Sequence, residues 1–81
     1  MKLVRTERFK RNLRRFSKSV QRAFYKQAEF LLANLMHPSL RAKKYDETIG
    51  LWQARINHNI RFYFLIEGDT YILVSVEKHR D

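Results

Sequence analysis

The sequence has no cysteine, two glycines, one proline and no long uninterrupted run of apolar residues. Without cysteine the chain has neither a disulfide framework nor a thiolate zinc site, which is typical of proteins in a reducing compartment. Two glycines are too few for a glycine-rich loop that cradles phosphate groups. No apolar run approaches the ~20 residues of a membrane helix, and the N-terminus becomes charged before a signal-peptide core forms. We therefore expect a cytoplasmic protein that does not enter the membrane.

Acidic residues are scarce as well, since 8 Asp and Glu stand against 17 Lys and Arg, for a net charge of +9. The excess lies in residues 1–26, which hold ten basic residues and one acid, whereas residues 27–81 are balanced. Five of these basic residues recur at helical steps of three and four within two runs, Arg8, Arg11 and Arg15, then Arg22 and Lys26. Such stripes favour a polyanionic partner, either nucleic acid or an acidic protein, over the alternative of a merely solvated helix face.

The apolar content is sufficient for one hydrophobic core. Of the 81 residues, 44% are hydrophobic and 14% are aromatic, which argues against intrinsic disorder. Two separate cores would leave each half too small to fold alone, so we expect a single domain over residues 1–81.

The first half predicts a strand at Lys2–Arg5 followed by two amphipathic helices. Apolar residues keep helical spacing in two runs, Phe9, Leu13 and Phe16, then Val20, Phe24, Ala28, Leu31 and Leu35. Thr6 and Ser17 precede the runs and can cap the helices. The second helix is expected to continue through Met36 and to end at His37-Pro38, with His37 contacting its terminal carbonyls.

The second half predicts strands, because the hydrophobic period changes from 3.6 to 2 after a loop over residues 38–50. Apolar residues alternate with other residues in three runs, which are Trp52 to Ile56, Ile60 to Ile66 and Ile72 to Val76. Turn residues separate these runs at 57–59 and 67–69. The predicted fold class is α+β: an N-terminal strand, a two-helix hairpin and a three-strand antiparallel meander covered by helices on one face.

The turn lengths predict which side chains lie opposite each other. A three-residue loop at 57–59 places Arg55 directly opposite Arg61. A three-residue loop at 67–69 puts Phe62 beside Val74 and Arg61 beside Ser75. We prefer it to a two-residue turn, which would move Val74 to the wrong face, since a one-residue slip inverts every side chain.

The predicted outer face of this meander carries many functional groups, which are Gln53, Arg55, Arg61, Tyr63, Ser75, Glu77 and His79. Two arginines opposite each other repel, and a bound phosphate would relieve the conflict because guanidinium groups match its oxygens. The alternative is that Glu77 neutralises Arg61. Histidine is the side chain that most often transfers protons in enzymes, so His79 is a candidate acid or base.

The other two histidines are given structural interpretations. We expect His37 to act as a cap and His58 to be an exposed turn residue. The three histidines lack the close spacing of a metal site, so no metal and no cofactor is expected.

Two segments carry a family pattern. LWQARINHNIRFYF (51–64) contains W-x-x-R-I and then hydrophobic-R-hydrophobic-x-F, and YILVSVEKHRD (71–81) brings His79 late in the chain. With the element order, these segments resemble the RelE/ParE superfamily of toxins from type II toxin–antitoxin systems. RelE-type members are ribosome-dependent endoribonucleases that cut mRNA, whereas ParE-type members poison DNA gyrase.

The resemblance implies roles for individual residues. Arg55 and Arg61 would stabilise the scissile phosphate, His79 would be the acid, and Glu77 or Glu47 the base. RNA-binding positions would also include Gln53, Tyr63 and Lys78, and the partners would be mRNA, the ribosome and an acidic antitoxin. Some nuclease members carry lysine where this chain has Gln53, and several end in a tyrosine that this chain lacks, so a gyrase inhibitor stays open. A third possibility is a degenerate member that only binds RNA or antitoxin.

The antitoxin interface is expected on the basic helices. Its candidate residues are Arg11, Arg15 and Arg22, because opposite potentials steer an acidic partner to a basic surface.

Overall fold

The computed structural model describes residues 1–79, so the last two residues of the family-like segment 71–81 lie outside the described residues. Its elements are β1 (Lys2–Arg5), α1 (Glu7–Arg14), α2 (Lys18–Ala33), the 3₁₀ helix η1 (Pro38–Leu40), β2 (Lys43–Asp46), β3 (Leu51–Arg55), β4 (Ile60–Glu67) and β5 (Thr70–Lys78). None of the helices in this part of the chain is long and apolar enough to cross a membrane.

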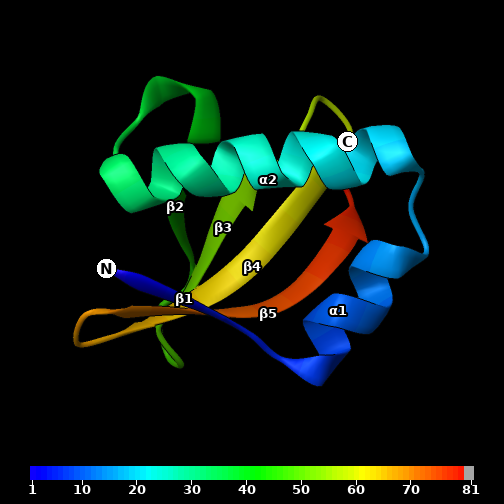
Figure 1. Ribbon diagram of the computed structural model, residues 1–81. Coiled ribbons are helices and arrows are strands. Elements are labelled where there is room, and N and C mark those ends of the chain that lie inside the picture. The colour runs from blue at the N-terminus through cyan, green and yellow to red at the C-terminus, as the bar shows by residue number, and fades with distance from the viewer. Residues whose placement is uncertain (80–81) are drawn as a thin grey trace.

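The strands form one mixed sheet in the order β1-β5-β4-β3-β2, in which β1 is parallel to β5 and the other pairs are antiparallel. The α+β class and the order strand, two helices, meander are confirmed. The meander is longer than predicted, however, because part of the expected loop 38–50 forms η1 and β2. In Figure 1, α2 crosses one face of the sheet, and α1 lies beside the C-terminal half of β5.

Both helices begin at the predicted caps. The hydroxyl oxygens of Thr6 and Ser17 accept hydrogen bonds from the amides of Phe9 (3.1 Å) and Val20 (3.2 Å). The expectation that α2 runs to Met36 is wrong, because the helix ends at Ala33. His37 also acts differently: its Nδ1 accepts from the amide of Ser39 (3.1 Å), so it caps η1 rather than α2.

The core fills the space between α2 and the sheet. The Phe24 ring of α2 lies 5.0 Å from the Phe9 ring of α1 and 5.4 Å from the Phe62 ring of β4. These three rings are at most 1% exposed. Most of each predicted apolar stripe is buried, while Phe16, Val20 and Leu35 are partly buried against the core. Edge-to-face aromatic contacts of this kind add to the stabilisation that burial alone provides.

A β-bulge in β5 overturns the predicted register. The turn at Gly68-Asp69 has two residues, so Phe64 pairs with Leu73, and the ladder then shifts so that Tyr63 pairs with Ser75. The bulge leaves Val74 as the extra residue and restores the inside–outside alternation beyond it.

The register correction moves two predicted pairs. Phe62 pairs with Val76 instead of Val74, and Arg61 pairs with Glu77 instead of Ser75. Before the bulge, Leu73 faces the core. Ile72 and Val74, which were expected inside, therefore lie on the outer face.

Helix α1 takes the place of a neighbouring strand along the second half of β5. The amide of Thr6 and its hydroxyl both donate to the carbonyl oxygen of Leu73, at 3.2 and 2.8 Å. Farther along, the amide of Val76 donates to Asn12 Oδ1 at 3.1 Å. Side chains thus satisfy backbone groups that would otherwise remain at the sheet edge, and they fix a strongly basic helix beside the outer face.

Candidate functional site

Arg55 and Arg61 are directly opposite each other on β3 and β4, as the sequence predicts. The shared orientation follows from the pleat, since alternate residues of a strand point to the same face. The core-facing neighbours Ala54 and Phe62 are completely buried, so both arginines lie on the face away from α2.

The two guanidinium groups share one backbone acceptor. Arg61 Nη1 donates to the carbonyl oxygen of Asn57 at 2.9 Å, and Arg55 Nε donates to the same oxygen at 3.3 Å. Within the described residues, every hydrogen bond of the Arg61 guanidinium uses Nη1. The Nε and Nη2 groups of Arg61 can therefore donate to a ligand.

The turn also places His58 beside Arg55. His58 Nδ1 lies 3.3 Å from Arg55 Nη2, so the guanidinium can donate to this nitrogen when it carries no proton. The interpretation of His58 as a simple exposed turn residue was incomplete. The signal was present in the sequence, because His58 follows Arg55 by three residues within one tight turn.

Glu77 faces Arg61 across the β4–β5 ladder. The two side chains, both in the described part of the chain, do not approach within the 4.0 Å of an ion pair, and Glu77 Oε2 instead accepts from Ser75 Oγ at 3.3 Å. His79 continues the strand past Lys78, because its amide donates to the carbonyl oxygen of Asn59 at 2.7 Å. The predicted candidates Glu77 and His79 therefore lie at the end of the sheet that carries the arginine pair.

Two predicted RNA-binding residues on this face are largely covered. Gln53 is 6% exposed and Tyr63 is 7% exposed. The Tyr45 ring of β2 packs edge-on against Tyr63, with ring centroids 5.0 Å apart. Burial raises the pKa of the Tyr63 phenol, the charge of Glu77 and the Tyr45 phenol raise it further, and Arg61 lowers it.

The remaining predicted residues are not joined to the pair. Lys78 pairs with the core-facing Ile60 and lines a separate hollow with Arg15 of the α1–α2 junction. Glu47 is exposed in the loop after β2, and it lines neither the hollow beside Arg55 nor the one beside Tyr63. Within residues 1–79, no three His, Asp or Glu side chains are grouped as ligands for a metal ion.

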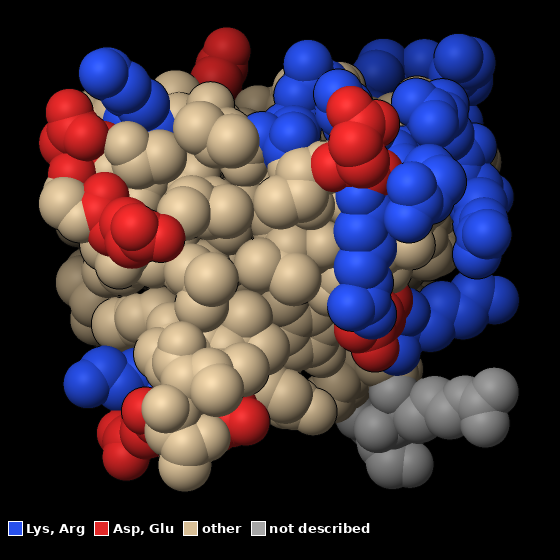
Figure 2. Space-filling view, turned by 90° about the horizontal axis from the view of Figure 1, so that it is seen from below, with Lys and Arg blue, Asp and Glu red and all other residues tan. Residues whose placement is uncertain are grey.

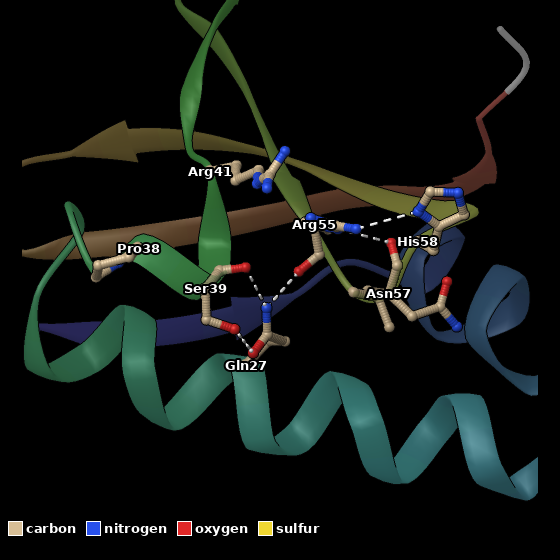
Figure 3. A pocket seen from close by; sticks show the side chains of 8 residues that line it. Gln27, Pro38, Ser39, Arg41, Arg55, Asn57 and His58 are labelled. Carbon is tan, nitrogen blue, oxygen red and sulfur yellow. Dashed lines mark hydrogen bonds between the residues drawn. The ribbon is translucent and has the colours of Figure 1, made fainter.

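A buried glutamine on α2 braces the strand that carries Arg55. Gln27 is 5% exposed, and its Nε2 donates to the carbonyl oxygens of Arg55 (2.7 Å) and Ser39 (3.0 Å). Its Oε1 accepts from Ser39 Oγ at 2.9 Å, so α2, η1 and β3 are tied together at one amide (Figure 3). The sequence signal was a polar residue inside the apolar stripe of α2.

A polar hollow of about 410 Å³ lies above this brace, between η1 and the 57–58 turn. Figure 3 shows the Arg41 and Arg55 side chains on the side of the hollow away from α2. Arg41 adopts a left-handed backbone conformation (φ 46°) directly after η1, which is uncommon for a residue with a side chain. The sequence did not indicate Arg41, because only the tertiary fold brings it to Arg55.

The basic residues of the helices form one side of the molecule. Arg11, Arg15 and Arg22 are all exposed, as predicted for a docking surface. Figure 2, viewed from the side opposite α2, shows Lys and Arg gathered along one side and an uncharged surface across the middle.

Solved structures of bacterial and archaeal toxins share this fold. A YoeB/ParE toxin from Agrobacterium tumefaciens matches with a TM-score of 0.80 at 16% identity, covering 99% of this chain and 100% of that chain. The YoeB dimer from Staphylococcus aureus gives 0.81 at 14% identity, covering 99% and 98%. A chain of the RelB–RelE antitoxin–toxin complex from Methanococcus jannaschii gives 0.77 at 18% identity, covering 93% and 88%.

No protein-family model and no curated protein matches the sequence significantly. The fold implied by the sequence resemblance is nevertheless confirmed, since the chain has the fold of the RelE/ParE superfamily toxins.

Proposed function

We propose that this chain, which shares its fold with RelE, YoeB and ParE toxins, is the toxin of a toxin–antitoxin system and cleaves mRNA on the ribosome. The observation that carries the proposal is the pairing of Arg55 with Arg61 on one exposed end of the sheet. A sequence selected for stability alone gains nothing from like charges directly opposite each other. A phosphodiester offers the negative charge that this arrangement favours.

The arginine pair would stabilise the phosphate as its charge increases during the reaction. Guanidinium groups donate in a planar fork that matches two phosphate oxygens, and they stay charged at any physiological pH. Their shared bonds to the Asn57 carbonyl hold both groups before RNA arrives. Preorganised donors of this kind lower the barrier because they need no rearrangement in the transition state.

Glu77 and His79 would supply the proton transfers. Glu77 takes the proton of the RNA 2′-hydroxyl, the 2′-oxygen bonds to phosphorus, and the bond from phosphorus to the 5′-oxygen breaks. His79 gives a proton to that leaving oxygen, so the products are a 2′,3′-cyclic phosphate and a 5′-hydroxyl. Glu77 is preferred to Glu47 as the base because it lies opposite Arg61 in the ladder.

An acidic antitoxin is the proposed protein partner. The chain has a net charge of +9, concentrated on the helices, and the similar structures include toxin–antitoxin complexes from Staphylococcus aureus and Methanococcus jannaschii. Arg11, Arg15 and Arg22 would attract acidic side chains of that partner.

The proposal is tested by growth after induction. Arg61→Ala should abolish growth inhibition while the thermal unfolding transition stays close to that of the wild type. Arg14→Ala is the matched control, because Arg14 is exposed on α1 and belongs to no proposed site. Full toxicity of a folded Arg61→Ala protein would remove the arginine pair from the mechanism.

A further inference from the structure

An apolar hollow lies on the outer face of the sheet, next to the arginine pair. Its volume is about 290 Å³, and it is lined chiefly by Tyr45, Ile49, Leu51, Tyr63, Leu65 and Val74. The bulge at Val74 contributes to it, because the displaced register turns this valine outward. Figure 2, seen from the side opposite α2, shows that much of this side of the molecule is uncharged.

Tyr45 forms an exposed aromatic wall of this hollow. Its side chain is 60% exposed, and the ring stands edge-on to the buried Tyr63 ring with an interplanar angle of 67°. Ile49, in the following loop, is 62% exposed. The Tyr63 contact covers part of the Tyr45 ring, and the high exposure of the residue leaves the rest of it accessible to a ligand.

The hollow is continuous with the arginine pair along two strands. Tyr63 is followed at the same face of β4 by Arg61, and Ser75 is followed at the same face of β5 by Glu77. The Cα atoms of residues two apart on a strand are about 7 Å apart, a spacing that one nucleotide can span, and the Arg61 guanidinium lies toward the 57–58 turn. The electrostatic influence of both Glu77 and Arg61 on the Tyr63 phenol agrees with this proximity.

We propose that the Tyr45 hollow binds the nucleobase of an unpaired RNA nucleotide whose phosphate lies on Arg55 and Arg61. The inference rests on the proposed function and extends it to the recognition of single-stranded RNA. Bases of unpaired RNA are held by stacking on aromatic side chains beside a basic surface, and every base has a face for stacking. An apolar hollow with an exposed tyrosine beside two arginines combines both requirements.

The rim can add hydrogen bonds to the edge of the base. Arg8 of α1 and Glu77 of β5 both line the hollow, so a guanidinium donor and a carboxylate acceptor lie on the side next to β5. Arg8 reaches this position because Thr6 and Asn12 fix α1 to β5. The basic helix beside the sheet therefore also contributes to the proposed RNA surface.

The test measures fluorescence anisotropy with a short 2′-O-methyl RNA, which cannot be cleaved through its 2′-oxygen, and with its abasic counterpart. The wild type should bind the base-bearing oligonucleotide more tightly than the abasic one. Tyr45→Ala should weaken binding of the base-bearing oligonucleotide by about 5- to 100-fold and leave the abasic one unchanged. Tyr45→Phe, which keeps the ring, should bind like the wild type.

Two further variants separate this inference from the proposed function. Tyr25→Ala removes a tyrosine that is 48% exposed on α2, far along the chain from the hollow, and should bind both oligonucleotides normally. Arg61→Ala should weaken the binding of both oligonucleotides by the same factor, because both retain their phosphates.

Different results would contradict the base site and the phosphate site. Wild-type affinity of Tyr45→Ala for both oligonucleotides, with loss in Arg61→Ala, would overturn the base site and leave the phosphate site standing. Absence of binding by the wild type would overturn the base site, whereas the proposed function would still be decided by the growth experiment with Arg61→Ala. If Tyr45→Ala changed only self-association in sedimentation, the hollow would be an interface between copies of the chain, and the inference would be wrong.

Discussion

Arg55 and Arg61 face each other across the β3–β4 ladder, and both guanidinium groups donate to the carbonyl oxygen of Asn57. The turn that reverses the chain therefore also supplies the acceptor that holds two like charges together. One carbonyl carries only a partial negative charge, so the pair keeps a net positive potential toward the solvent. Substitutions around this pair, on the helices and on the strands, should change the stability of the protein, the titration of Tyr63 or the rate of association with a partner.

The N-caps of the two helices should differ in their contribution to stability. Ser17→Ala removes one cap bond and should lower the free energy of unfolding by about 1 kcal/mol. Thr6→Ala removes a cap bond and also the bond from Thr6 to the Leu73 carbonyl, so we expect about 2 kcal/mol. Urea denaturation of the two variants measures the difference. Equal losses would mean that the Thr6 bond to β5 contributes nothing.

Replacing Gln27 should lower the free energy of unfolding far more than replacing Gln21, another glutamine on the same helix. Gln27→Leu removes the donor shared by two carbonyl oxygens, those of Arg55 and Ser39, and the acceptor of the Ser39 hydroxyl, so the free energy of unfolding should fall by about 2 kcal/mol. Gln21 makes one bond, to the Phe16 carbonyl, in a half-buried place that water can reach. Gln21→Leu should therefore cost less than about 1 kcal/mol. Similar urea midpoints for both variants would contradict the bracing role.

Tyr63 should make stability fall at alkaline pH. Its pKa is raised by burial, so above the ordinary value of about 10 the unfolded chain loses the phenolic proton while the folded chain keeps it. Unfolding then releases a proton, and the free energy of unfolding decreases until the pH reaches the folded pKa. Between pH 9 and 11, the wild type should lose more stability than Tyr63→Phe. If the free energy of unfolding fell equally with pH in the wild type and in Tyr63→Phe, the Tyr63 phenol would not contribute to the pH dependence.

Glu77 should contribute to the same shift. The charge of Glu77 is the second cause of the raised Tyr63 pKa, so Glu77→Gln should lower that pKa toward its ordinary value. Tyrosinate absorbance during an alkaline titration follows the change. An unaltered titration curve would place the Glu77 carboxylate out of range of the phenol.

The antitoxin should associate through the basic helices. Reversing the charges of Arg11, Arg15 and Arg22 together should slow association at low salt by at least about tenfold and flatten its salt dependence. The control reverses Lys2, Lys43 and Lys44, which are exposed elsewhere and change the net charge equally. Stopped-flow mixing measures both rates. If the control slowed association as much, only the total charge would matter.

The sequence predicted those features of the fold that depend on periodicity and local chemistry. The helix starts at Thr6 and Ser17 were found because hydroxyl caps precede apolar stripes. Strand β2 was missed because KKYD shows no alternation, and it becomes a strand by pairing with β3. The predicted register of β5 is wrong because it holds only for a regular ladder, and the bulge at Val74 reconciles a two-residue turn with a buried apolar face.

The sequence predicts the part of the candidate site that lies within the β3–β4 hairpin. Arg55 and Arg61 were paired correctly, because the turn between β3 and β4 is short and fixes which residues are opposite. Gln27, Arg41 and Tyr45 come from three other elements, so no spacing in the sequence relates them to the pair. Their contribution becomes visible only when η1, β2 and α2 are placed around β3.

The most direct test of the account maps RNA ends in cells after induction. Wild-type protein should generate new 5′-hydroxyl ends within translated mRNA, and the Arg61→Ala variant should generate none. A reporter of DNA damage, read in the same cultures, should stay silent. Damage signalling without new RNA ends would contradict the account and indicate action on DNA gyrase instead.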